Sequence, residues 1–73
     1  MENITEIQTR LDILEDYSAS LEVDILATQE QLQSETDDTH IIFCEDHLDM
    51  LRFELNKVNA DIYIFRRKLK SFN

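Results

Sequence analysis

The sequence contains neither glycine nor proline. These two residues supply the backbone conformations of tight β-turns and phosphate-binding loops, and proline marks stiff linkers. Their absence excludes Gly-rich phosphate loops and Pro-rich linkers, and it disfavours sheets that depend on tight turns. A chain of 73 residues with this composition is expected to be all-α and to form a single domain over residues 1–73.

Cysteine and long apolar runs are also scarce. The single Cys44 cannot form an internal disulfide, which excludes a disulfide-stapled secreted scaffold. No apolar run approaches the ~18 residues of a membrane-spanning helix. The first residues lack the basic and apolar layout of a signal peptide. We therefore expect a cytoplasmic protein that makes no membrane contact.

Basic residues are nearly missing from the first two thirds of the chain. Residues 1–49 contain fourteen acidic side chains and one base, Arg10, and sum to −13, whereas residues 50–73 sum to +4. The resulting net charge of −9 repels nucleic acids and anionic membranes and attracts basic proteins.

Apolar residues follow two heptad registers. The first occupies a and d positions from Ile4 to Leu32, and seven of its nine residues are Ile or Leu. The second runs from Ile41 to Phe72, and all ten of its residues are apolar. Such a 3.5-residue period predicts two helices that pack through a coiled-coil-like seam.

The two registers do not join. Leu32 and Ile41 are nine residues apart, which is two more than one heptad, whereas coiled coils absorb insertions of three or four residues. A polar segment lies between them, and its Asp37, Asp38 or Thr39 is a suitable helix cap. We predict an antiparallel hairpin with helices over about 3–33 and 40–71 and a turn over about 34–39. One unbroken helix of about 110 Å that dimerises in parallel is the alternative.

The predicted hairpin also brings charges together. The acidic N-terminal turn, with Glu2 and Glu6, is expected beside the basic residues near the C-terminus. Asn3, followed by Glu6, predicts a capping box at the start of the first helix.

The second helix has a second apolar stripe away from its heptad seam. Its members are Ile42, Phe43, Met50, Phe53, Ala60, Tyr63 and Ile64. A helix that is apolar on two sides is expected to be buried on both. The stripe predicts a homodimer that forms a four-helix bundle, and docking of a different protein is the alternative.

Candidate sites for chemistry are few. His40, Cys44 and His47 follow one helix face at a spacing that zinc accepts, but Cys44 also belongs to the apolar seam, where cysteine acts as a small hydrophobe. Adjacent acids such as Glu15 and Asp16 point about 100° apart and do not converge on one atom. We expect no enzymatic activity, no resident metal and no cofactor.

Binding of another protein is the function that we expect, in an adaptor, an assembly factor or an inhibitor. The partner is expected to have a basic surface and to contact an acidic face made of Glu15, Asp16, Glu22, Asp24 and Glu30. Two alternatives involve nucleic acids. The acids, extended by Glu35, Asp37 and Asp38, could mimic a row of phosphates, or a basic segment could bind DNA or RNA through Arg66, Arg67, Lys68 and Lys70.

Overall fold

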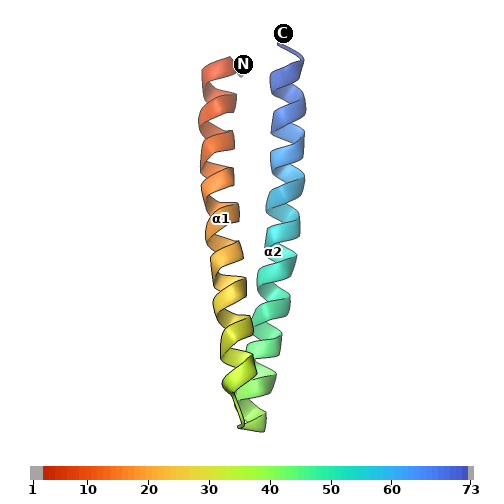
Figure 1. Cartoon of the computed structure of the whole chain (residues 1–73). Helices are drawn as coiled ribbons and strands as arrows, with labels where there is room; N and C mark the ends of the chain where they lie inside the picture. Colours follow the sequence, from red (N-terminus) through yellow and green to blue (C-terminus); the bar gives the residue numbers. More distant parts are fainter. Residues whose placement is uncertain (1–2, 73) are drawn as a thin grey trace.

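The computed structural model describes residues 3–72 and shows two long helices side by side (Figure 1). Helix α1 spans Ile4–Ser34 and α2 spans Asp38–Lys70. The helices run antiparallel, so the two chain ends lie together at the end opposite the turn (Figure 1). The all-α hairpin predicted from the two registers is confirmed, and the single long helix is wrong.

Side-chain caps begin both helices. Oδ1 of Asn3 accepts a hydrogen bond from the backbone N–H of Glu6 at 2.9 Å. Oδ1 of Asp37 accepts one from the N–H of Thr39, also at 2.9 Å. Each bond satisfies a donor that has no partner within its helix, which favours helix initiation at these positions. At the other end of α2, Arg67, Lys68 and Lys70 complement the negative end of the helix dipole.

The turn consists of three residues, 35–37, and Glu35 organises it. Oε1 of Glu35 accepts hydrogen bonds from the backbone N–H groups of Thr36 and Asp37, each at 3.1 Å. Oε2 lies 3.3 Å from Nδ1 of His40. No described residue has a positive φ angle. The connection needs no glycine, because none of residues 35–37 adopts the left-handed conformation that glycine favours. The Glu35 carboxylate satisfies the backbone N–H groups of the turn.

This turn is shorter than the segment 34–39 that the sequence indicated. Ser34 belongs to α1, whereas Asp38 and Thr39 belong to α2. The difference arises because Asp37 is the cap, so helical geometry begins at the next residue.

The core is the predicted seam between the helices. Ile7 is 1 % exposed, and the other buried apolar residues of the seam are Leu11, Leu21, Cys44, Leu48, Leu51, Val58 and Ile62. The ends of the two registers behave differently, because Ile4 and Phe72 are exposed where the hairpin opens. Thr28 is a buried polar residue of the seam, and its hydroxyl donates to the carbonyl oxygen of Asp24 at 2.8 Å. That bond removes the cost of burying an unsatisfied hydroxyl.

Two polar pairs lie along one side of the seam. The Ser18 hydroxyl lies 3.1 Å from Oδ1 of Asn59, and Nη2 of Arg66 lies 3.6 Å from Oε1 of Glu15. Arg66 thus reaches Glu15 rather than the acidic first turn with which it was predicted to pair. Glu15 and Arg66 are heptad e positions on the same side of the seam, which accounts for their contact. The predicted contact of Glu2 lies outside the described residues.

Candidate protein-interaction surfaces

The most prominent surface feature is an apolar face on the side of α2 that points away from α1. We call it the outer α2 face and define it by Ile42, Phe43, Met50, Phe53, Ala60, Tyr63 and Ile64. All seven residues are exposed. Phe43 and Phe53 are 75 % and 70 % exposed, although a buried phenylalanine contributes among the largest apolar areas of any side chain. The sequence placed these residues on a second stripe, and the structure leaves that stripe uncovered.

Helix geometry explains why α1 does not cover this face. Successive residues of a helix are rotated by about 100°, so Phe53 lies about 200° around the axis from the buried Leu51. Ile62 and Ile64 are related in the same way, and they are 6 % and 50 % exposed. A hairpin of two helices contains no third element that could reach the outer side of α2.

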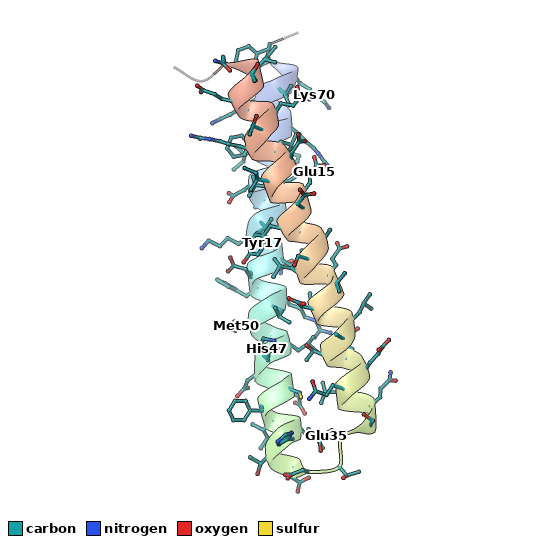
Figure 2. All side chains as sticks on the ribbon, turned by 90° about the vertical axis from the view of Figure 1, so that its left-hand side faces the viewer. Glu15, Tyr17, Glu35, His47, Met50 and Lys70 are labelled. Atoms are coloured by element: carbon teal, nitrogen blue, oxygen red, sulfur yellow. The ribbon has the colours of Figure 1, made fainter. Side chains whose placement is uncertain are left out.

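Part of the outer α2 face is a shallow groove near the turn. The groove measures about 520 Å³ and is lined by Thr39, Ile42, Phe43, Asp46, His47 and Met50. His47 and Met50 lie close together on the α2 side of the hairpin (Figure 2). A second groove, on the side of the hairpin near Thr28, shares Phe43 and His47 with the first.

The five residues of the acidic face are all exposed, but they do not form one row. Glu22 and Asp24 lie on opposite sides of the seam, and Glu30 points away from α2, so together the acids cover about 200° of α1. Within residues 3–72, Glu15 is the member with an ion-pair partner, Arg66. The surface of α1 is therefore broadly acidic, without a single charged ridge.

Two acids of the nucleic-acid-mimic alternative are engaged in the turn. The carboxylate of Glu35 accepts two backbone hydrogen bonds and contacts His40. The carboxylate of Asp37 caps α2. These groups stabilise the fold, so they are poorly available as mimics of phosphate.

The three candidate zinc ligands occupy neighbouring turns of α2 and do not form a metal site. Cys44 is 8 % exposed and belongs to the seam, as its heptad position predicted. His40 contacts Glu35. Across the described part of the chain, no group of three or more His, Cys, Asp or Glu side chains has an arrangement that could hold a metal ion.

The basic segment is divided among several contacts. Arg66 pairs with Glu15, and Arg67 donates to the Tyr63 hydroxyl at 3.1 Å with its guanidinium carbon 5.8 Å from the ring centroid. The ammonium of Lys68 lies 5.1 Å from the centroid of Phe65. Lys70 is exposed near the open end (Figure 2). Arg66, Arg67 and Lys70 lie within about 100° of one another around α2, and Lys68 points to another side, so the cations form a patch about one helical turn long rather than the extended stripe that nucleic acids favour.

A further polar pair between the helices, Tyr17 with Glu54, was not predicted from the sequence. The Tyr17 hydroxyl lies 3.3 Å from Oε1 of Glu54. Desolvation raises the pKa of Tyr17, and the negative charge of Glu54 and the hydrogen bond to it raise it further. Both residues occupy g positions, which face each other in an antiparallel pair, so the heptad registers contained the signal.

No protein-family model, curated protein or solved structure matches this chain. No helix within residues 3–72 combines the length and the apolar character needed to cross a membrane.

Proposed function

We propose that this protein is a non-enzymatic helical hairpin that associates with itself through the outer α2 face and binds another protein. In this role it acts as a small adaptor, assembly factor or inhibitor. The observation that carries the proposal is the exposure of two phenylalanines, Phe43 and Phe53, on one apolar face. An apolar patch of this kind on a small protein is typical of an interaction surface.

Physical considerations support self-association. Removing each large apolar side chain from water contributes roughly 1.5–3 kcal/mol, and the outer α2 face has several of them. A two-helix hairpin of this length has a small core and gains stability from oligomerisation. A second copy of the chain offers the same apolar face, so the surfaces match in character and extent.

Sedimentation equilibrium of the wild type and of two charge variants tests this proposal. We expect a dimer at micromolar concentration for the wild type and a monomer for Phe53→Glu, because a buried unpaired carboxylate is costly. Val23→Glu is the matched control, since Val23 is 63 % exposed on α1, away from the outer α2 face. A wild-type protein that stays monomeric and helical at high concentration would overturn the proposed self-association.

The acidic surface of α1 supports a partner with a basic surface. Long-range attraction between opposite charges raises the rate at which two proteins associate. An acidic protein associates faster in this way only with a partner that has a basic surface. Affinity capture from cells with the wild type and Phe53→Glu separates two modes of binding. A partner retained by both variants binds away from the outer α2 face, whereas a partner lost with Phe53→Glu requires that face or the dimer.

A further inference from the structure

Four residues of the outer α2 face and two exposed charged residues between them, Asp46 and Lys57, form a pattern that is complementary to itself when the helix direction is reversed. Its central line, at helical spacings of three and four, consists of Phe43, Asp46, Met50, Phe53, Lys57 and Ala60. Read forwards, the line is apolar, acidic, apolar, apolar, basic, apolar. Read backwards, it has the same order with the acid and the base exchanged.

We infer that two copies pack antiparallel through this line, with Asp46 of each copy beside Lys57 of the other. The inference rests on the self-association proposed above and specifies its geometry. In this register Met50 meets Phe53 of the second copy near the twofold axis, and Phe43 meets Ala60. A thioether against an aromatic ring and a large side chain against a small one are favourable contacts.

The two charges that interrupt the apolar line thus neutralise each other. A parallel dimer would instead place Asp46 against Asp46 and Lys57 against Lys57, which is unfavourable. The antiparallel register has a second electrostatic advantage. It brings the basic end of α2, around Arg66 and Arg67, next to the acidic turn of the second copy, around Asp37 and Asp38.

The position of this line on α2 determines the overall shape of the dimer. Its centre lies about 150° around the helix axis from the seam that α1 covers. A square four-helix bundle needs contact faces about 90° apart, because each helix there touches two neighbours at a corner. Contacts on nearly opposite sides of α2 give a flat layer in the order α1, α2, α2, α1. This geometry differs from the four-helix bundle expected from the sequence.

Charge reversal tests the antiparallel register. Asp46→Lys is expected to weaken the dimer about 3- to 20-fold, because each dimer contains two such pairs and both become repulsive. Lys57→Asp should have a similar effect, and the double variant Asp46→Lys/Lys57→Asp should restore the wild-type dimer constant. The readout is sedimentation equilibrium at low ionic strength, with circular dichroism to confirm that each variant remains helical.

A control reverses an acid that lies off the line. Glu45→Lys has the same change of charge as Asp46→Lys and is one residue away, on a different side of α2. We expect it to affect the dimer less than Asp46→Lys does. If the double variant is no better than the single variants, the antiparallel register is wrong, and the self-association itself stands because the wild type still dimerises.

Spin labels at Val23 test the flat layer. In a Cys44→Ala background, Val23→Cys gives one label on the outer side of α1, close to the height of the twofold axis. Helix axes pack about 8–10 Å apart, so the two labels of a flat layer are expected about 40 Å apart, and those of a square bundle about 30 Å or less. A distance of about 30 Å or less between the two labels, in a variant shown to be dimeric, would overturn the flat-layer geometry. A wild type without any dimer would overturn the proposed self-association instead.

Discussion

The hydroxyl of Tyr17 on α1 donates a hydrogen bond to Oε1 of Glu54 on α2 across 3.3 Å. Both side chains lie beside the seam, and the contact joins residues 37 positions apart in the sequence. The bond requires the protonated phenol, because a phenolate cannot donate and is repelled by the carboxylate. This requirement agrees with the upward shift in the pKa of Tyr17.

The first prediction concerns alkaline pH. The pKa of Tyr17 is raised above its ordinary value of 10.0, so the folded state favours the neutral phenol. The contribution of Tyr17 to stability is complete below pH 10.0 and is lost as the pH rises through the folded-state pKa. In a Tyr63→Phe background, which leaves one tyrosine, ultraviolet titration should place this pKa above the value in the unfolded chain.

Glu54→Gln tests the cause of the shift. Removal of the negative charge should lower the pKa of Tyr17 toward its ordinary value, since two of the three causes involve Glu54. Glu45→Gln removes a negative charge elsewhere on α2 and is the control. An equal shift in both variants would mean that the general charge of the protein, rather than the contact with Glu54, determines the pKa.

The second prediction concerns the turn. Glu35→Ala should lower the free energy of unfolding by about 1 kcal/mol, because the backbone N–H groups of Thr36 and Asp37 lose their acceptor. Chemical denaturation measures the change. Glu30→Ala removes an exposed acid within α1 and should have little effect. Equal stability of the two variants would show that water replaces the Glu35 carboxylate without cost.

The third prediction compares two isoleucines that differ in burial. Ile62→Ala should cost about 2–5 kcal/mol at every protein concentration, because Ile62 is 6 % exposed and its truncation leaves a cavity in the seam. Ile64 is 50 % exposed in the hairpin. Ile64→Ala should therefore have a small effect on the dilute monomer and a larger one at concentrations where the dimer forms.

Thermal unfolding over a hundredfold range of concentration distinguishes the two positions. The loss of stability caused by Ile62→Ala should stay constant over this range. The loss caused by Ile64→Ala should grow with concentration as mass action populates the dimer. A deficit at Ile64 that is independent of concentration would indicate that the outer α2 face does not take part in self-association.

The fourth prediction concerns the acidic surface. The combined changes Glu22→Gln, Asp24→Asn and Glu30→Gln should leave helicity intact and raise stability by a few tenths of a kcal/mol at low salt, because they relieve repulsion between like charges. Salt should abolish this difference by screening. For a basic partner obtained by affinity capture, the triple variant should associate more slowly and with a weaker salt dependence.

A partner that binds the triple variant and the wild type at the same rate would show that these acids do not take part in recognition. Their contribution would then be limited to keeping the protein dispersed in water. The outer α2 face would remain as the surface that binds.

The sequence was sufficient for the seam and for the first helix cap. A strict apolar period placed Leu21, Val58 and Ile62 in the core, and Asn3 with Glu6 marked the start of α1. The heptad period and the cap are both read from residues close together in the sequence, and each is compatible with few structures. The period also placed Phe43 and Phe53 on a stripe away from the seam, where they are exposed in the hairpin.

The turn and the ionic contacts were harder to predict for a physical reason. Asp37, Asp38 and Thr39 are all good caps, and in the structure Asp37 caps α2 while its own backbone N–H donates to Glu35. Arg66 has a long side chain, and the register between the helices decides that Glu15 is its partner. The partner of a long side chain depends on which residues of the two helices lie opposite each other. Residues close together in the sequence do not determine that alignment.

The two chain ends emerge together from one end of a rod that is 53 Å long (Figure 1). Tension applied between these ends loads the outermost layer of the seam, near Ile7, before any other layer. The helices would therefore peel apart one layer at a time toward the turn, at low force. A load between one chain end and the turn would instead run along a single helix and pull on its backbone hydrogen bonds, without opening the seam from its end. The same fold is thus mechanically weak across its ends and strong along its axis.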